Sequence, residues 1–374
     1  MRILAVIDTL GYGGAERLLV SLLPELKKKN IYCALAVASP PYSLLAELKE
    51  AGIDVYCLDI RHPWSFLKAS ARLARICKKE KIDIVWGHLY FGNLYAGLAR
   101  LFYWRLRVVW TLHYKFPNQK NLKQHIMLSL ERLVLKYFVS SRVAVSQAVL
   151  DSYQEASKDN LICIYNGVPI ANLPGPLKAE RRAIVRNLFS VNTNDFLIVV
   201  PARYVAVKGH LVLCEALSIL SNKYEWHPIC VAAGSGGLKL AIQQRIDELN
   251  LTVTFRLLDS LPQADLFDLM QVADVVAMPS LVEPFGIAAA EAMALGIPTV
   301  LTNVDGFKEL VGDSQSALMV PVNDAAALAE ALWILHRNDD LRDVLSNVGK
   351  NRMQENFDTS VVVQYWVNLF MKIN

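Results

Sequence analysis

The sequence predicts an α/β protein with two doubly wound parallel-sheet domains. Short runs rich in Val and Ile alternate with stretches of helical period, which is the pattern of βαβ units. A Pro- and Gly-rich segment interrupts this alternation near residues 166–176, and a second series of the same kind follows it. The length of 374 residues suits two domains of ordinary size.

The first series is expected to form an N-terminal domain over residues 1–168. Its Val- and Ile-rich runs suit strands that are buried on both faces of a parallel sheet. Amphipathic helices are expected between the strands, most clearly at 15–29 and 64–79. The expected strands are 2–8, 31–38, 54–58, 82–86, 107–112, 141–145 and 161–165.

The second series follows a linker and a first helix (178–189), which together occupy residues 169–194. The linker is predicted from Asn166-Gly167-Val168-Pro169 and Leu173-Pro174-Gly175-Pro176, which favour turns. A C-terminal domain is expected over 195–358, and a last helix within 359–374 is expected to return to the N-terminal domain. Ligands of such sheets bind beyond the carboxyl ends of the strands, so the expected site is a cleft between the domains. The strands expected here are 195–201, 228–233, 252–257, 274–278 and 298–302.

Composition narrows the class of protein. Hydrophobic residues make up 53% of the chain and charged residues 20%, which excludes disorder and fibrous repeats. The six cysteines lie in apolar stretches without a C-x-x-C pair, which favours reduced core cysteines in a cytoplasmic protein. Met1-Arg2 leads directly into the first strand, and no run of about 18 apolar residues lacks a charge. Neither a secretion signal nor a spanning helix is therefore expected.

Positive charge is concentrated between Arg61 and Arg142. This segment holds 16 Lys and Arg against three acids, a net charge of +13; the whole chain carries +4, so the remainder carries −9. Trp104, Trp110 and Phe116 lie in the same segment, and basic residues mixed with aromatics suit an anionic membrane surface. A solvated basic face over core aromatics is the alternative. Nucleic acid is not an expected partner, because no known binding module is present.

The first motif is a glycine-rich turn, Gly11-Tyr12-Gly13-Gly14-Ala15-Glu16, between the first strand and the first helix. Glycines let a backbone approach a phosphate closely, and a helix N-terminus attracts an anion. The turn lacks the last glycine of G-x-G-x-x-G and the G-K-[ST] of a P-loop, so it is neither of these phosphate motifs. A tight turn without a ligand is the alternative.

The second motif is a pair of cations, Arg203 and Lys208, between a strand and a helix of the C-terminal domain. Two cations five positions apart at the carboxyl edge of a sheet suit a diphosphate. Surface cations on a loop are the alternative.

The third motif places two carboxylates, Glu283 and Glu291, eight positions apart around the turn Pro284-Phe285-Gly286 and a helix that begins near Ile287. Amides after Glu283 would face a phosphate, and carboxylates accept hydrogen bonds from sugar hydroxyls. Glu291 lies in an otherwise apolar helix, where a buried acid requires a partner. Solvated acids without a ligand are the alternative.

In this order the three motifs resemble the retaining glycosyltransferases of family 4, whose GT-B fold has two Rossmann-like domains. The resemblance covers nearly the whole chain, and the E-x7-E spacing is its most specific element. It implies an N-terminal domain that binds the acceptor and a C-terminal domain that binds a nucleotide sugar. His113, in Trp110-Thr111-Leu112-His113-Tyr114, matches a family histidine that touches the donor sugar.

The resemblance also implies roles for single residues. Arg203 and Lys208 would hold the diphosphate, Glu283 would bind hydroxyls of the sugar, and Glu291 would bind those of the ribose. Glu16 and His88 are expected on the acceptor side; a packing role is the alternative for His88, which follows a strand. The expected catalytic residues are His113, Glu283, Arg203 and Lys208. The expected donor-binding residues are Gly13, Gly14, Arg203, Lys208, Glu283, Phe285, Gly286, Ile287 and Glu291.

No metal or organic cofactor is expected, because the sequence has no D-x-D, no H-x-x-x-H and no His/Cys cluster. Cations and a helix N-terminus would instead stabilise the leaving diphosphate. The sequence thus predicts a metal-independent retaining hexosyltransferase, cytoplasmic and peripheral on the inner face of the membrane. UDP-glucose is the expected donor and a lipid-linked glycan the expected acceptor, in polysaccharide or surface-glycan biosynthesis. A non-hydrolysing UDP-sugar epimerase and a catalytically inactive GT-B binding protein are the alternatives.

Overall fold

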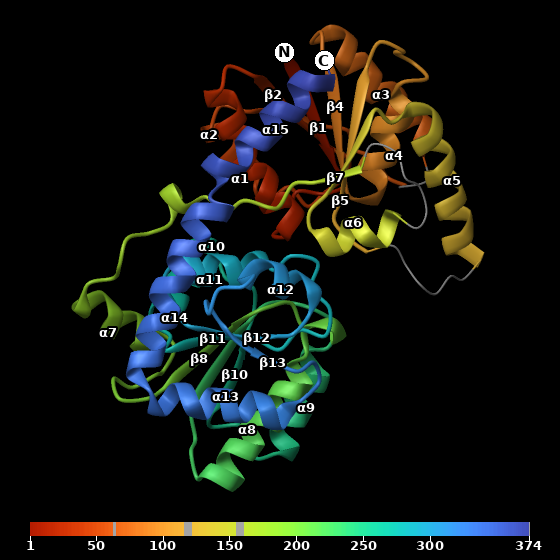
Figure 1. Cartoon of the computed structure of the whole chain (residues 1–374). Helices are drawn as coiled ribbons and strands as arrows, with labels where there is room; N and C mark the ends of the chain where they lie inside the picture. The colour runs from red at the N-terminus through yellow and green to blue at the C-terminus, as the bar shows by residue number, and fades with distance from the viewer. Residues whose placement is uncertain (63–64, 116–121, 155–160, 374) are drawn as a thin grey trace. The chain divides into compact units, whose positions relative to one another are not determined.

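The computed structural model describes residues 1–62, 65–115, 122–154 and 161–373 (Figure 1). The chain divides into two compact units. The N-terminal unit comprises Met1–Pro169 and Asp358–Asn374, and the C-terminal unit comprises Ile170–Phe357. Each unit contains one parallel sheet with helices packed on it, which confirms the predicted fold class.

The sheet of the N-terminal unit has, within the described residues, the strand order β3-β2-β1-β4-β5-β6-β7. All neighbouring strands run parallel. The first strand in the sequence lies inside the sheet and the chain winds outward from it in both directions, so the unit is doubly wound. The strands are β1 (Arg2–Ile7), β2 (Tyr32–Val37), β3 (Asp54–Cys57), β4 (Ile84–His88), β5 (Arg107–Leu112), β6 (Ser141–Ala144) and β7 (Leu161–Cys163).

Helices cover both faces of this sheet, and strand β1 shows how the sequence encodes that arrangement. Ile3, Ala5 and Ile7 join one buried cluster with helix α1, whereas Leu4 and Val6 join another with helices α3 and α4. Alternate side chains of a strand point to opposite faces, so both sets must be apolar. The helices are α1 (Gly14–Lys28), α2 (Leu45–Glu50), α3 (Phe66–Lys79), α4 (Leu89–Ala99), α5 (Leu122–Phe138), α6 (Gln147–Gln154) and α15 (Thr359–Ile373).

Helix α15, the last in the chain, packs in the N-terminal unit beside α1 (Figure 1). Its Trp366 is buried against Trp86 of β4, with ring centroids 4.3 Å apart, and Phe370 lies edge-on to Trp86 at 5.3 Å. Aromatic pairs of this kind contribute about 0.5–1.5 kcal/mol beyond the burial of their area. The chain therefore passes from one unit to the other twice, near Pro169 and near Phe357.

The C-terminal unit repeats this pattern with the strand order β10-β9-β8-β11-β12-β13, again parallel throughout the described residues. The strands are β8 (Leu197–Pro201), β9 (Ile229–Ala233), β10 (Phe255–Leu258), β11 (Val275–Met278), β12 (Thr299–Thr302) and β13 (Leu318–Val320). The helices are α7 (Ala179–Leu188), α8 (His210–Tyr224), α9 (Lys239–Glu248), α10 (Gln263–Gln271), α11 (Ile287–Ala294), α12 (Asp305–Val311), α13 (Ala325–Arg337) and α14 (Asp339–Arg352). Strand β13 was not among the strands expected from the sequence.

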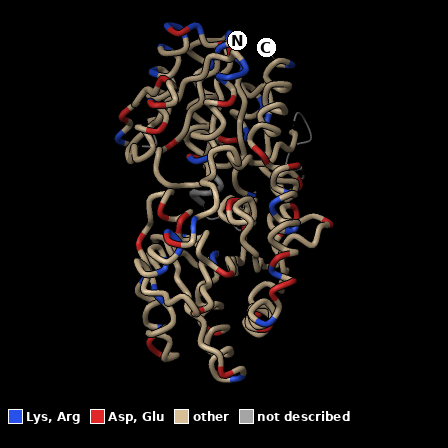
Figure 2. Tube along the Cα trace, turned by 90° about the vertical axis from the view of Figure 1, so that its left-hand side faces the viewer, with Lys and Arg blue, Asp and Glu red and all other residues tan. Residues whose placement is uncertain are grey.

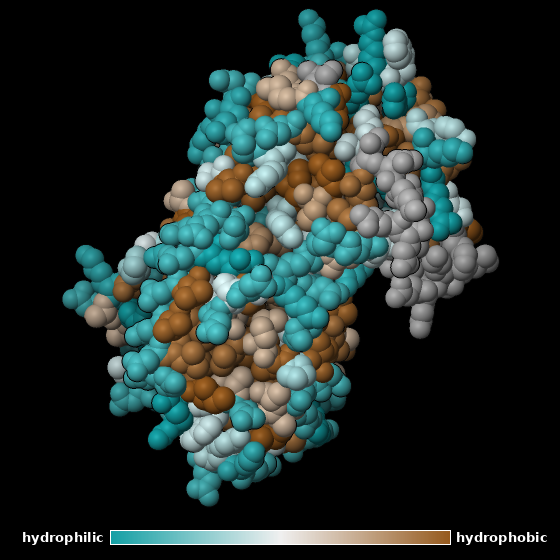
Figure 3. Space-filling model, in the orientation of Figure 1, coloured by the Kyte–Doolittle hydropathy of each residue, from teal (hydrophilic) through white to brown (hydrophobic). Residues whose placement is uncertain are grey.

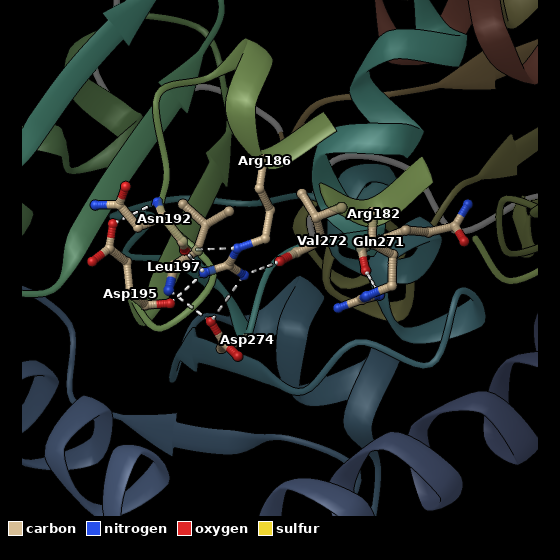
Figure 4. A network of polar contacts seen from close by, with 8 residues as sticks. All are labelled: Arg182, Arg186, Asn192, Asp195, Leu197, Gln271, Val272 and Asp274. Carbon is tan, nitrogen blue, oxygen red and sulfur yellow. Dashed lines mark hydrogen bonds and ion pairs between the residues drawn. The ribbon is translucent and has the colours of Figure 1, made fainter. Parts of the chain in front are cut away.

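Helix α7, which follows the linker, is fastened to the C-terminal unit by a polar network (Figure 4). The buried Arg186 guanidinium donates to Val272 O at 2.9 Å and to Asn192 O at 3.1 and 3.0 Å. It also lies 3.7 Å from the Asp274 carboxylate, which accepts from Leu197 N at 2.7 Å. These contacts tie α7 to the start of β8 and to the segment before β11.

Both signs of charge are distributed along each unit in Figure 2, and Figure 3 shows apolar surface on the C-terminal unit bordered by hydrophilic residues. No helix among the described residues is long and apolar enough to cross a membrane.

The cysteines are free, as expected, but the expectation that all six lie in the core is wrong for two of them. Cys57 ends the edge strand β3 and is exposed, and Cys163 is only partly buried.

Candidate functional site

The glycine-rich turn of the N-terminal unit lies beyond the carboxyl end of β1. Gly13 caps helix α1, and Glu16 in the first helical turn is buried and folds back over it. A Cβ atom on Gly13 would lie 2.2 Å from the Glu16 carboxylate, so a larger residue here would require that carboxylate to move. Glu16 also accepts from Thr9 Oγ1 at 3.3 Å. The predicted residues Gly13 and Glu16 thus adjoin one another at the N-terminus of α1.

Asp8 is a partly buried acid at the same edge, and it was not among the site residues expected from the sequence. Its Oδ1 accepts from Gly92 N, at the start of α4, at 2.5 Å. Burial raises the pKa of the Asp8 carboxyl from 3.8 to about 6, and the nearby Glu16 adds to the rise, while backbone N–H groups of Gly92 and Phe91 oppose it. The available signal was an acid directly after a buried parallel strand.

His88 and His113 meet at the ends of the neighbouring strands β4 and β5. The distance between His88 Nδ1 and His113 Nε2 is 3.1 Å, and both rings are buried. Burial lowers the pKa of His113 to about 4 and that of His88 well below 6.5, so both rings are neutral at pH 7. The arrangement favours His88 Nδ1–H as the hydrogen-bond donor. The reverse would bury the Nε2–H of His88, which has no partner in the described structure.

In the C-terminal unit, Lys208 and Glu283 form an ion pair between the Nζ and Oε2 atoms. Lys208 lies between β8 and α8, and Glu283 lies between β11 and α11, so the pair joins loops at the carboxyl edge of two neighbouring strands. The backbone reinforces it, since Leu281 N donates to Val207 O at 2.8 Å. The Lys208 side chain is 14% exposed and the Glu283 side chain 10% exposed. Their attraction is stronger for this reason, because little water screens the two charges.

The other predicted residues of this unit lie at the same edge in different environments. Glu291 is buried in α11 and accepts from Gln263 Nε2 at 3.3 Å. Arg203 follows β8 and is exposed. Phe285 is buried against Phe357, with ring centroids 5.5 Å apart, so its side chain belongs to the core and only its backbone would be available to a ligand.

Gly286 shapes the start of helix α11. Its φ of +99° is a conformation that other residues rarely adopt, and a Cβ atom would lie 2.4 Å from the Phe307 ring. The turn leaves the first backbone N–H groups of α11, from Ile287 onward, without helical partners. Such a helix start, with a lysine beside it, is suited to bind phosphate oxygens. No group of three or more potential metal ligands occurs among the described residues.

The aromatic residues of the basic segment do not share one environment. Trp104 is 74% exposed between α4 and β5. Trp110 is 1% exposed, so its expected place at a membrane surface is wrong: it lies on β5 inside the core of the N-terminal unit. Phe116 and Lys120 lie outside the described residues, as does the side chain of Lys123.

Two family models match the chain, one for each half. The model described as "Glycosyltransferase Family 4" matches residues 12–172, and that described as "Glycosyl transferases group 1" matches residues 182–352. Together they include every residue of the three motifs except Gly11.

Similar proteins include a D-inositol 3-phosphate glycosyltransferase from Corynebacterium urealyticum, 28% identical over 70% of this chain and 64% of that protein. A phosphatidyl-myo-inositol mannosyltransferase from Mycobacterium leprae is 29% identical over 62% of this chain and 59% of that protein. The chain thus spans less than two thirds of these relatives. The structure of Anabaena Alr3699/HepE in complex with UDP and glucose aligns over the whole of both chains, with 20% identity and a TM-score of 0.87. That likeness supports the GT-B fold.

Proposed function

Because the chain belongs to the family 4 glycosyltransferases, we propose that it transfers a sugar from a nucleotide donor to an acceptor hydroxyl with retention of configuration. The observation that carries the proposal is the Lys208–Glu283 pair beside the Gly286 turn, at the start of helix α11. A cation and free helical N–H groups at one sheet edge suit a leaving diphosphate, and a carboxylate suits sugar hydroxyls.

The C-terminal unit would bind the donor. Lys208 and the exposed Arg203 would contact the diphosphate, whose negative charge grows as the bond to the sugar breaks. The backbone at Gly286 and Ile287 would contact the same phosphates. Glu283 would accept from hydroxyls of the sugar, and the buried Glu291 would accept from those of the ribose.

The N-terminal unit would contribute His113 at the sugar and the turn at Gly13 and Gly14 at the phosphates. His88 would then act as a positioning residue, because its bond to His113 Nε2 leaves the proton of His113 on Nδ1. A neutral His113 is able to donate one hydrogen bond without adding charge near the breaking bond.

UDP-glucose is the donor we propose, and no metal ion is required. Support for the nucleotide comes from the structural likeness to a protein that holds UDP and glucose. Support for an acceptor at the membrane comes from a relative named for transfer to phosphatidyl-myo-inositol. We place the reaction on a lipid-linked glycan in polysaccharide or surface-glycan synthesis, on the cytoplasmic face of the inner membrane.

An anionic membrane surface would bind the N-terminal unit at helix α5. Ile126, Leu133 and Tyr137 are each more than half exposed and recur at helical spacing, so they form one apolar stripe. Basic side chains accompany it, with Lys136 Nζ 5.3 Å from the Tyr137 ring centre. The exposed Trp104 lies nearby in the fold, because Arg100 of the same loop donates to Phe138 O at 3.4 Å.

Vesicle sedimentation tests this surface. Wild-type protein should sediment with anionic phosphatidylglycerol vesicles at low salt and should not bind uncharged phosphatidylcholine vesicles. High salt should release it, because dissolved ions screen the attraction between basic side chains and anionic lipid. The double variant Leu133→Ser and Tyr137→Ser should lose binding. Leu240→Ser is the matched control, since Leu240 is an exposed leucine of the other unit. If the double variant binds vesicles as well as the control does, helix α5 is not the membrane-binding surface.

Product analysis separates transfer from its alternatives. With UDP-glucose and a membrane extract, a transferase releases UDP and forms a glucoside with the anomeric configuration of the donor. A non-hydrolysing epimerase would convert UDP-glucose into a second UDP-sugar without an acceptor. A catalytically inactive binding protein would bind UDP-glucose and change neither molecule. Lys208→Ala should abolish turnover if the proposed site performs it.

A further inference from the structure

We propose that the N-terminal unit has a two-chamber pocket for a phosphorylated, hydroxyl-rich molecule, with the phosphate held by Arg61, Lys68 and Arg72. The inference rests on the proposed function only in taking this molecule to be the acceptor. The pocket lies wholly within one unit, at the carboxyl ends of β1, β2 and β3.

The first chamber is basic. Its volume is about 370 Å³, and its lining includes Arg61, His62, Lys68 and Arg72 against one acid, Asp59. Lys68 and Arg72 are four residues apart on α3 and so project from one side of that helix. The first turn of α3 adjoins the chamber at Ser65, where backbone N–H groups lack helical acceptors. Three permanent cations and a helix start are complementary to a phosphate dianion.

The cations in this chamber are available to a ligand. Within the described part of the chain, Arg61 and Lys68 make no hydrogen bond or ion pair with the protein. Arg72 uses Nη1 to donate to Leu58 O, which orients its guanidinium and leaves other N–H groups unused. Asp59 accepts from the Tyr42 hydroxyl at 2.9 Å. Arg61, Lys68 and Arg72 therefore outnumber the single Asp59 carboxylate, and this excess of positive charge raises the local potential and attracts an anion.

The second chamber adjoins the first and shares Asp59, Ile60 and Arg61 with it. Its volume is about 380 Å³, and it adds the Asp8 carboxyl, the Ser39 segment and the rings of Phe91 and Tyr95. Carboxyl and hydroxyl groups bind ring hydroxyls, and aromatic side chains cover the apolar C–H face of a ring. The two chambers together therefore fit a polyol ring that carries a phosphate, in preference to either part alone.

Calorimetric titration of the full chain with inorganic phosphate, glucose 6-phosphate and glucose tests the pocket. Wild type should bind glucose 6-phosphate at least tenfold more tightly than phosphate, and phosphate more tightly than glucose. Lys68→Gln and Arg72→Gln should each weaken phosphate binding at least tenfold. Arg75→Gln is the matched control, because Arg75 is an exposed cation of the same helix that does not line the chamber.

Each outcome decides one part of the proposal. Equal phosphate binding by Lys68→Gln and Arg75→Gln would overturn the basic chamber, and glucose 6-phosphate that binds no more tightly than phosphate would overturn the second chamber. Vesicles with phosphatidylinositol, titrated against phosphatidylglycerol vesicles, distinguish a lipid headgroup from a soluble phosphate ester. UDP-glucose affinity must stay unchanged in Lys68→Gln, since its loss would make the pocket part of the donor site. If the wild-type protein binds phosphate in this pocket but does not bind UDP-glucose, the pocket is supported and the proposed transferase function is wrong.

Discussion

At the scale of single residues, the Lys208–Glu283 pair is the group on which the proposed chemistry depends most. Each side chain comes from a different loop, and the pairing is nearly buried. Removing one partner of such a pair leaves the other as an uncompensated charge, so the two side chains hold each other at the sheet edge.

Lys208→Met should weaken UDP-glucose binding by about 1.5–3 kcal/mol, or roughly 10- to 150-fold, because it removes a charge-assisted contact to phosphate. Glu291→Ala should have an effect of similar size through the ribose. Isothermal titration calorimetry measures both. Lys223→Met is the control, since Lys223 lies at the end of α8 against the Tyr224 ring. If both site variants bind UDP-glucose with wild-type affinity, the donor site does not lie at this sheet edge.

Asp8 should give the N-terminal unit a distinctive pH dependence. Burial raises its pKa from 3.8 to about 6, so the folded state binds the proton more tightly than the unfolded state. Stability from this group is therefore greatest at low pH and is lost as pH rises from about 4 through 6. Asp8→Asn keeps an oxygen to accept from Gly92 N but cannot ionise.

The free energy of unfolding of Asp8→Asn, relative to wild type, should accordingly increase by up to ~3 kcal/mol between pH 4 and pH 7. Urea denaturation at both pH values measures it, and taking the difference from wild type cancels the other titrating groups. A difference that does not change with pH would show that Asp8 titrates normally in the folded protein.

The sequence pointed to candidate groups through local spacing, but it did not show which of the selected side chains contact one another across the sheet. The pair Arg203 and Lys208 and the pair Glu283 and Glu291 are each within one loop–helix segment. The contact between His88 and His113 depends on the register of β4 and β5, which sets His88 opposite Thr111. Trp110 was misplaced because basic neighbours in sequence do not make a residue exposed when its strand, like β5, is buried on both faces of the sheet.

At the scale of elements, the turn before α11 is the most constrained part of the candidate site. Gly286 has positive φ, and any side chain there would meet the Phe307 ring. The same turn is bonded to the start of helix α12, because Gly306 N donates to Glu283 O at 3.2 Å. A change at Gly286 would therefore move Glu283 and the start of α11 together.

Gly286→Ala should destabilise the C-terminal unit by about 1–3 kcal/mol and reduce UDP-glucose binding, because the backbone must leave its conformation or displace Phe307. Thermal unfolding with and without UDP-glucose gives both quantities. Gly237→Ala is the control, since a Cβ atom there meets nothing within 4 Å. If Gly286→Ala matches Gly237→Ala in both readouts, the turn does not shape the site.

Long buried strands and amphipathic helices were predictable because their patterns are local. The expected strand 107–112 coincides with β5, and the expected helix 359–373 coincides with α15. Strand β13 was not predicted because its three residues, Leu318–Val320, are too few to show the periodicity that distinguishes a strand from a loop. The strand is defined by its hydrogen-bonded pairing with β12, and this pairing is not visible in the local sequence.

At the scale of the whole molecule, each sheet places its loops so that residues distant in sequence meet at the carboxyl edge. In the N-terminal unit these are the glycine turn, Asp8, the histidine pair and the phosphate pocket proposed here. In the C-terminal unit they are the loops of Lys208 and Glu283. The sequence predicted the division into two such units, but the pocket at Arg61, Lys68 and Arg72 depends on how β3 and α3 pack and was not foreseen.

Calorimetric titration of the whole chain with UDP-glucose in the presence of EDTA tests whether the protein binds a nucleotide sugar without a metal ion. We expect saturable binding at one site, unchanged when Mg²⁺ or Mn²⁺ replaces EDTA, because Arg203, Lys208 and the start of α11 would supply the positive charge that an ion otherwise provides. GDP- and ADP-sugars should bind more weakly than UDP-glucose. Absence of UDP-glucose binding, or binding that appears only when a divalent ion is added, would show that the proposed metal-independent donor site is wrong.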